Sequence, residues 1–469
     1  MKRWPRAGTV AIAMGAVLGA GGLLAEEARK FKLITLDPGH FHAALVQKFM
    51  YSDVDSVVHV YAPPGDDVAQ HLKRIESFNT RAENPTHWQT QTYTGKDYFE
   101  KMLAEKPGNI VVLAGNNARK TDYILRSVEA GLNVLADKPM AITPAEFTKL
   151  EKAFSVAEAK DVLLYDIMTE RFEITSILQR ELSQHTELFG ELAKGTPESP
   201  AIVKESVHHF SKVVAGSPLI RPQWFFDVRQ EGEGIVDVTT HLVDLVQWQA
   251  FPEQALEPSD ATVLSARRWS TELTPAQFKQ VTGANSFPSY LRNDVRDGNL
   301  HVYSNGEFTY RLKNIHARIS VIWNFEAPAG AGDTHYSTMR GTKAALTIRQ
   351  GAEQKYRPVL FIEKANNVDP AAHESAVKNA INSLQTKYPG IGVRAATANE
   401  KAAWVVTVPE KYSVGHEAHF AQVTENYLRY LRQGELPKWE VPNMLTKYAT
   451  IMQAYEKSRS ESRSNSQSK

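Results

Sequence analysis

The sequence predicts a parallel, doubly wound α/β domain followed by an α+β domain with a largely antiparallel sheet. Over residues 31–167, short apolar runs alternate with segments of helical spacing. From about Arg171 the alternation stops, and longer strand-like runs follow. At 469 residues the chain is long enough to bury at least two cores. We therefore expect two folded domains, over residues 31–167 and 168–457.

The first domain has the pattern of repeated βαβ units. Its expected strands are residues 32–36, 57–62, 110–114, 134–136 and 162–165. Helical spacing begins near His42 and covers 67–78 and 121–130. Strands that alternate with helices indicate a parallel sheet with right-handed crossovers, as in a Rossmann domain. Ligands of such sheets bind at the carboxyl ends of the strands.

The second domain lacks this alternation. Its expected strands are residues 201–210, 307–312, 317–325 and 344–348, and helical spacing returns at 417–431 and 442–457. The last residues, 458–469, are polar and of low complexity, so we predict a disordered tail.

Composition excludes several classes of function. The chain is 42% hydrophobic and 23% charged, with a formal net charge of +1, which is typical of a soluble globular protein and gives no reason to expect nucleic acid. It contains no cysteine, so disulfides, thiolate metal sites and a cysteine nucleophile are excluded. A small-molecule partner is expected.

The N-terminus has the pattern of a signal peptide. Lys2, Arg3 and Arg6 precede a charge-free run over residues 7–25. We predict cleavage after Ala25, a periplasmic or otherwise exported protein, and no stable membrane span after cleavage. The alternative is an uncleaved anchor, because Leu23 is bulky for the position three residues before the cleavage site.

The turn after the first strand lies where a Rossmann domain binds the phosphates of a nucleotide. We expect Gly39, His40, Phe41 and His42 to contact a cofactor there. Of the three glycines in GxGxxG only the middle one, Gly39, is present. An ordinary loop between strand and helix is therefore the alternative.

No acidic residue ends the second strand, so Asp66 or Asp67 must reach back to hold a ribose. The choice between NAD and NADP stays open.

Two further segments carry ionisable groups. Lys138 follows an expected parallel strand, and it points either into the crevice or to the surface. In residues 234–244, spacings of four and three align Asp237, His241 and Asp244 on one face of an expected helix. A carboxylate beside an imidazole orients a general base. The alternative is a hydrogen-bonded polar stripe between domains.

The Asp-Lys-Pro strand end and the DxxxHxxD segment together resemble the glucose-fructose oxidoreductase, inositol 2-dehydrogenase and MocA (Gfo/Idh/MocA) family. The resemblance implies that Lys138 faces substrate and nicotinamide, that Asp237 partners the substrate or the histidine, and that His241 is the acid/base. It places Asn116 and Asn117 beside the nicotinamide ribose.

The stretches PGHFHAALVQ, MTERFEIT and GDTHY resemble a bacterial subfamily with its own C-terminal oxidoreductase domain. In the wider family an open sheet face of the second domain commonly mediates dimers, so the resemblance implies a homo-oligomer.

Other polar residues are candidate substrate contacts. We expect Arg221, Asp244 and His209 to bind substrate; neighbours on a strand face opposite ways, so at most one of His208 and His209 enters the crevice. Residues 224–226 form either a sugar-stacking wall or core packing.

No metal site is expected. The pairs His416 with His419, beside Glu417, and Asp333 with His335 lack a third spaced ligand.

The resemblance implies an NAD- or NADP-dependent oxidoreductase that acts on a hydroxyl of a sugar, polyol or glycoside. Its cofactor is either exchangeable or tightly bound and recycled, as in glycosidases of the family that oxidise the sugar transiently. The alternatives are a carbohydrate-binding or structural protein that has lost the cofactor, and a metal-dependent hydrolase.

Overall fold

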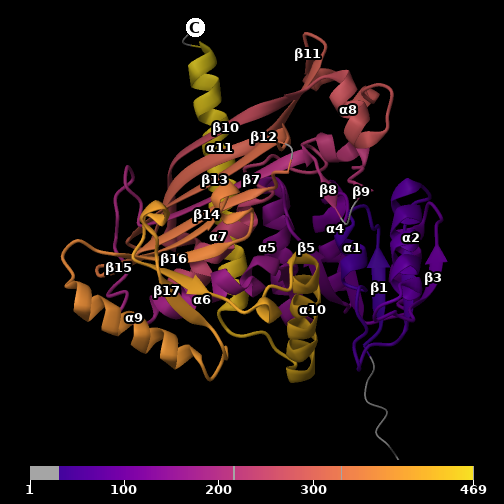
Figure 1. Ribbon diagram of the computed structural model, residues 1–469. Coiled ribbons are helices and arrows are strands. Elements are labelled where there is room, and N and C mark those ends of the chain that lie inside the picture. The colour runs from indigo at the N-terminus through magenta and orange to yellow at the C-terminus, as the bar shows by residue number, and fades with distance from the viewer. Residues whose placement is uncertain (1–30, 215–216, 329, 468–469) are drawn as a thin grey trace, which may run out of the picture.

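The structure, a computed structural model, describes residues 31–214, 217–328 and 330–467 (Figure 1). The predicted signal peptide, residues 1–25, lies outside the described residues. None of the helices in the described part of the chain combines the length and apolar character of a membrane-spanning helix.

The first domain is a six-stranded parallel sheet in the order β3-β2-β1-β4-β5-β6. Its strands are β1 (Leu33–Leu36), β2 (Val57–Tyr61), β3 (Gln89–Tyr93), β4 (Ile110–Leu113), β5 (Asn133–Asp137) and β6 (Leu164–Ile167). Its helices are α1 (His42–Leu45), α2 (Asp66–Thr80), α3 (Tyr98–Glu105), α4 (Asn117–Glu129) and α5 (Pro144–Ala159). The strand order reverses between β1 and β4, which is where ligands of doubly wound sheets bind.

The predicted Rossmann architecture is confirmed, with two local differences. The sequence analysis did not predict β3, because its sequence QTQTY is polar and largely exposed at the sheet edge. Helix α1 is only four residues long: Gln47 and Lys48 donate to carbonyls three residues back, so the chain leaves the helix in tight turns.

The second domain contains a ten-stranded sheet in the order β10-β12-β13-β7-β14-β15-β16-β18-β17, with β11 paired to β12. The strands are β7 (Ile202–Ser211), β10 (Ala261–Leu273), β11 (Val295–Arg296), β12 (Asn299–Leu312), β13 (Ile315–Glu326), β14 (Thr334–Arg340), β15 (Ala344–Gln350), β16 (Val359–Lys364), β17 (Gly392–Ala395) and β18 (Trp404–Thr407). All pairs are antiparallel except β13 with β7. The predicted, largely antiparallel sheet is confirmed.

The other elements of this domain surround the sheet. They are α6 (Ile174–Ser183), the short pair β8 (Val213–Val214) and β9 (Ser217–Pro218), α7 (Thr239–Ala250), α8 (Pro275–Thr282), α9 (Pro370–Leu384), α10 (His416–Gln433) and α11 (Glu440–Gln467), with single 3₁₀ turns η1 (Thr169–Phe172), η2 (Gln223–Phe226), η3 (Pro258–Asp260), η4 (Ser289–Asp294), η5 (Ala352–Gln354), η6 (Ala398–Glu400) and η7 (Glu410–Tyr412).

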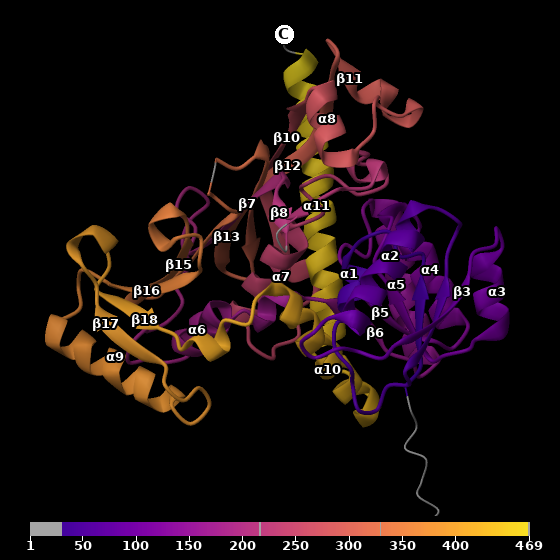
Figure 2. The ribbon, with the colours of Figure 1, turned by 45° about the vertical axis from the view of Figure 1, so that its right-hand side comes forward.

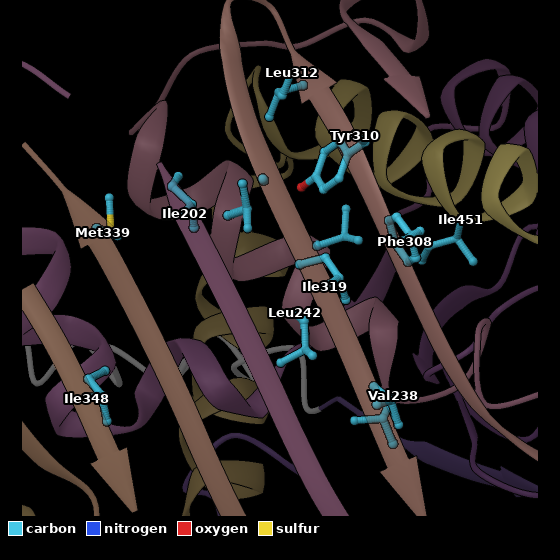
Figure 3. Close-up of a cluster of buried hydrophobic side chains, with 14 of the residues drawn as sticks. Ile202, Val238, Leu242, Phe308, Tyr310, Leu312, Ile319, Met339, Ile348 and Ile451 are labelled. Atoms are coloured by element: carbon cyan, nitrogen blue, oxygen red, sulfur yellow. The ribbon is translucent and has the colours of Figure 1, made fainter. Parts of the chain in front are cut away.

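Helices α7 and α11 cover one face of the large sheet. Leu242 of α7 and Ile451 of α11 are buried in one cluster with Ile319 of β13 and Phe308 of β12 (Figure 3). Figure 2 shows α11 standing between the large sheet and the first domain. The helix that carries His241 is therefore fixed against the sheet by burial of apolar area, the main favourable term in folding.

The C-terminal helices also belong to the core of the first domain. Phe420 and Tyr427 of α10 and Tyr448 of α11 are buried in the same cluster as the strands β1, β4 and β5. The sequence analysis assigned these helices to the second domain, because amphipathic spacing does not show which domain an apolar face contacts.

The predicted disordered tail differs from the structure. Helix α11 continues to Gln467, and Arg459 forms an ion pair with Glu233 at 2.6 Å. Tertiary contacts that the low-complexity pattern does not show support the helix past residue 457.

Candidate active site

The candidate site lies at the carboxyl ends of β1, β4 and β5, where three turns approach one another. The turn after β1 contains Gly39, the turn after β4 contains Gly115 and Asn116, and Lys138 directly follows β5. A Cβ atom on Gly115 would lie 2.2 Å from the carbonyl oxygen of Asp37. Only glycine therefore permits the first two turns to come this close.

Lys138 forms an ion pair with Asp237 across the two domains. Its Nζ lies 2.5 Å from Oδ1 of Asp237, and the side chains are only 11% and 8% exposed. Burial alone would lower the pKa of Lys138, but the carboxylates of Asp237 and Asp137 outweigh it and raise the pKa. Lys138 is therefore a fixed cation in the crevice.

His241 lies on α7 beside this pair, and it is buried. Burial, assisted by the charge of Lys138, lowers the pKa of His241 to about 4. Its Nδ1 has no hydrogen-bond partner among the described residues. The imidazole is therefore neutral near pH 7, with one ring nitrogen free to bind a ligand.

The predicted contact between Asp237 and His241 is not present, because Asp237 instead binds Lys138. Helix α7 begins only at Thr239, so Asp237 lies in the preceding turn and not on the helix face. The turn packs tightly on β12: a Cβ on Gly234 would lie 1.7 Å from the carbonyl oxygen of Ser304. Helical spacing therefore does not hold across this segment.

The glycine turn has an unusual first position. Asp37 stands where the first glycine of GxGxxG would be, with a φ of 48°, and its carboxylate accepts a hydrogen bond of 2.7 Å from Tyr123. The backbone N–H groups of Gly39 and His40 both donate to the carbonyl of Ala114. These two N–H groups therefore already form hydrogen bonds within the protein.

A pocket opens beside this turn. It is lined by residues 38–41, by Asp67 and Arg74 of α2, and by Arg221. Burial lowers the pKa of both arginines, that of Arg221 to about 10, so both remain cations near pH 7. A glycine turn, two guanidinium groups and a carboxylate at the start of α2 fit the phosphates and a ribose of a dinucleotide.

Two family models together match most of the chain. One, described as "Oxidoreductase family, NAD-binding Rossmann fold", matches residues 16–165. The other, described as "Putative oxidoreductase C terminal domain", matches residues 178–459. A crystal structure from Parabacteroides merdae, described as a "putative oxidoreductase", is 55% identical, with 92% of this chain and 98% of that chain covered and a TM-score of 0.90.

The chain belongs to the Gfo/Idh/MocA oxidoreductase family. This confirms the resemblance drawn from the Lys138 strand end and the DxxxHxxD segment. No curated protein matches the chain.

More distant solved structures share the Gfo/Idh/MocA fold. A levoglucosan dehydrogenase in complex with NADH and levoglucosan is 10% identical, with 92% of this chain and 98% of that chain covered and a TM-score of 0.57. A 3-ketoreductase from Actinomadura kijaniata in complex with NADP is 14% identical, with 91% and 96% covered and a TM-score of 0.54. At these identities the comparison supports the fold alone.

Two asparagines expected beside the nicotinamide ribose also join the domains of this Gfo/Idh/MocA protein. Asn116 donates from Nδ2 to Oε1 of Gln230 at 2.7 Å, and Asn117 donates to the carbonyl of Glu231 at 2.6 Å. The side chain of Asn116 also caps α4. Both residues therefore fix the second domain against the end of β4.

Asp244, expected to bind substrate, instead lies in a buried ion-pair network. Arg171 binds its carboxylate with two hydrogen bonds of 2.6 and 2.7 Å, and Lys447 lies 3.2 Å away. Asp244 is three residues beyond His241 on α7, and its partners lie on η1 and α11. Arg171 and Lys447 lower its pKa to about 2, against the opposing effect of burial.

The histidine pair on β7 behaves differently from the prediction. Nδ1 of His208 and Nδ1 of His209 lie 3.4 and 3.1 Å from the carboxylate of Asp333, which Lys212 also binds at 2.7 Å. Asp333 precedes β14, the neighbouring strand, and from there it reaches both imidazoles. Both histidines therefore pair with one carboxylate, although neighbouring side chains on a strand leave on opposite faces.

Arg221 packs over the rings of Phe225 and Trp323 and donates to the carbonyls of His209 and Phe210. The aromatic segment is divided: Phe225 and Phe226 are core residues, whereas Trp224 lies over Gly39 and donates to Asp67 at 2.9 Å. A continuous sugar-stacking wall is not present.

Sequence reasoning missed Glu170 and the role of Asp137. Glu170, from the MTERFEIT stretch, lies 3.6 Å from Nδ1 of His416, and Asp137 binds His42 at 2.9 Å. Burial would raise the pKa of Glu170, but His416 and His241 outweigh it and lower the pKa. No spacing rule connects these residues, since they come from four separate segments.

Proposed function

We propose that this protein is an NAD- or NADP-dependent oxidoreductase that acts on a hydroxyl group of a sugar, polyol or glycoside. The observation that carries the proposal is the convergence of a paired cation, Lys138, and a neutral buried imidazole, His241, in the crevice of an NAD-binding Rossmann domain. When bound, the nicotinamide supplies the hydride acceptor.

The three residues have distinct roles in this proposal. His241 accepts the hydroxyl proton, because its buried ring is neutral and Nδ1 has no partner in the described part of the chain. Lys138 donates a hydrogen bond to the same oxygen and offsets its developing negative charge. Asp237 positions Lys138 through the 2.5 Å ion pair.

The polar groups that border the crevice are suited to binding a carbohydrate. His208, His209, Lys212 and Asp333 form a hydrogen-bonding cluster on β7 and the start of β14. The side chain of His208 is 21% exposed and stacks on the buried ring of Trp323. Sugar hydroxyls both donate and accept hydrogen bonds, and such a cluster offers partners for both. Related structures bind levoglucosan or act as a 3-ketoreductase, which supports the same class.

The direct test is to denature the purified protein and analyse the extract by ultraviolet absorbance and mass spectrometry. Released NAD(H) or NADP(H) supports the proposal and identifies the cofactor. The folded protein is then incubated with each cofactor and a sugar panel while absorbance at the NADH band is followed. Absence of nucleotide, together with no binding of added NAD or NADP, would favour a cofactor-less carbohydrate-binding protein.

Replacing Gly39 with valine is expected to abolish nucleotide retention. An added Cβ would lie 3.1 Å from Trp224 and 3.2 Å from Asp67, so a branched side chain has no room beside the pocket. Nucleotide in the denatured extract should fall to background while circular dichroism stays unchanged. Gly351→Val is the matched control, because its Cβ would have only one neighbour, at 3.6 Å. If Gly39→Val retains its nucleotide, the phosphate site has been misplaced.

We also propose export, on the charge-free run behind Lys2, Arg3 and Arg6. A tightly held, recycled cofactor would suit an exported enzyme, since free nucleotide is expected to be scarce outside the cytoplasm. Fractionation of the native host should recover a chain that begins near Glu26 outside the cytoplasm. Equal recovery of full-length chain in the cytosol would refute export.

A further inference from the structure

A second cluster of ionisable side chains lies in the crevice, separate from the Lys138 pair. Nδ1 of His42 lies 2.9 Å from Oδ2 of Asp137, and Nδ1 of His40 lies 4.0 Å from the same oxygen. One ligand atom from each of the three residues lies within 4.8 Å of the other two. Oxidoreduction by the proposed mechanism requires none of them.

The three side chains are the donor set of a transition-metal site. Imidazole nitrogen and carboxylate oxygen both bind zinc, at about 2.0–2.2 Å, and three protein ligands with an open fourth position are typical of catalytic zinc sites. Ligands of one tetrahedral ion lie about 3.3 Å apart at these bond lengths, so the widest of the present separations, up to 4.8 Å, would have to shrink by about 1.5 Å. The side chains of His40, His42 and Asp137 are only 19%, 10% and 6% exposed.

Rigid segments hold the three groups in place. The backbone N–H of His40 donates to Ala114, His42 begins α1, and Nζ of Lys120 donates to the carbonyl of Asp137 at 2.9 Å. The backbone of each of the three residues is therefore held by the fold.

Two further imidazoles lie beside the cluster. The ring of His241, which the proposed mechanism uses as the base, interacts electrostatically with His42. The ring centroid of His416 lies 5.6 Å from that of His42. Nitrogen donors beyond the three proposed ligands therefore lie close to the site.

The surrounding charges permit a cation. Lys138 and Lys120 oppose one, but Asp237 pairs with Lys138, and the Nζ of Lys120 is bound to the backbone carbonyl of Asp137. Glu170 and Asp137 supply negative charge nearby. A hydrogen bond between His42 and Asp137 alone would explain two of the residues but not the convergence of His40.

We propose that His40, His42 and Asp137 bind a divalent transition metal of the zinc type in the crevice, with a coordination position left open. The site adjoins the proposed nucleotide pocket, which His40 also lines, and its test does not depend on turnover.

The test uses tag-free full-length mature protein, stripped with a chelator and dialysed. Zn²⁺ is titrated by calorimetry, and Co²⁺ is added as a spectroscopic probe. We expect one tight Zn²⁺ per chain and intense visible absorption of the Co²⁺ protein, as low-coordinate nitrogen and oxygen ligation gives. His40→Ala and His42→Ala should each weaken Zn²⁺ binding by more than the roughly 10- to 100-fold typical of losing an outer-shell partner.

His87→Ala is the matched control, because His87 is exposed on a loop of the same domain. It should bind Zn²⁺ as the wild type does. If His42→Ala does not fold, as judged by circular dichroism, His40→Ala decides, since the ring of His40 is partly exposed and accepts only a long hydrogen bond of 3.4 Å, from the backbone N–H of His42. Failure of the wild type to bind Zn²⁺ or Co²⁺ stoichiometrically, or equal binding by His40→Ala, would overturn the proposal. Nucleotide in the same samples is measured separately, so loss of the metal site and loss of the cofactor are distinguished.

Discussion

His241→Ala should lower turnover of the sugar substrate by about 10²- to 10⁴-fold, the usual contribution of a positioned general base. The buried ring of His241 is neutral and interacts electrostatically with Lys138, and alanine removes the proton acceptor without removing a charge. Nucleotide binding should be unchanged, since His241 does not line the pocket beside the glycine turn. Steady-state rates with saturating cofactor measure the effect on turnover.

The pH profile gives an independent check. The pKa of His241 is lowered to about 4, so the ring is neutral, and able to accept a proton, at every pH above that value. Oxidation by the wild type should therefore be constant towards neutral pH and fall only as the pH drops through about 4. In His241→Ala this acidic limb should be absent.

Asp237→Asn provides the comparison. Because Asp237 contacts Lys138 and not His241, its removal should reduce turnover less than His241→Ala and should leave the acidic limb in place. Full activity of His241→Ala on the true substrate would show that the DxxxHxxD segment is structural in this protein.

The fold could be predicted because its signals are local. Buried parallel strands such as β4 and β5 appear as short apolar runs, and turns with glycine or proline separate them from helices. Two features have no local signal of this kind. The sequence of β3 is polar throughout, so it does not indicate a strand. The apolar face of α10 indicates a helix, but not that the helix packs on the first domain.

The site could be predicted only in part, for a similar reason. Lys138 and His241 were found through spacing and resemblance, and the structure brings them into one crevice. The predicted contact between Asp237 and His241 is absent, because helix α7 starts two residues after Asp237. The cluster of His40, His42 and Asp137 forms only through a long-range contact between the turn after β1 and the end of β5. His42 and Asp137 are 95 residues apart in the sequence, and no motif includes both.

Lys447→Met should destabilise the folded protein by about 3–5 kcal/mol, the usual cost of breaking a buried ion pair. Lys447 is fully buried on α11, and its Nζ lies 2.8 Å from Asp166 on β6 and 3.2 Å from Asp244 on α7. The lysine thus joins both domains through one atom. Methionine has a similar volume but no charge. The buried carboxylates of Asp166 and Asp244 then have less positive charge to compensate them.

The sign of the pH dependence follows from Asp244. Its pKa in the folded protein is about 2, below the ordinary value of 3.8, so its ion pairs stabilise the fold above about pH 4, and this stabilisation is lost as the pH falls towards 2. In Lys447→Met the pKa of Asp244 should rise, and the loss of stability should begin at higher pH.

Urea unfolding followed by circular dichroism measures the difference in the free energy of unfolding. Lys378→Met is the matched control, since Lys378 pairs with Glu374 on the exposed face of α9 with a side chain 60% exposed. Exposed pairs of this spacing contribute only about 0.3–0.5 kcal/mol. If Lys447→Met changes stability no more than Lys378→Met, the ion pairs of Lys447 do not hold the DxxxHxxD helix against the first domain, and Arg171 and apolar packing must position His241 instead.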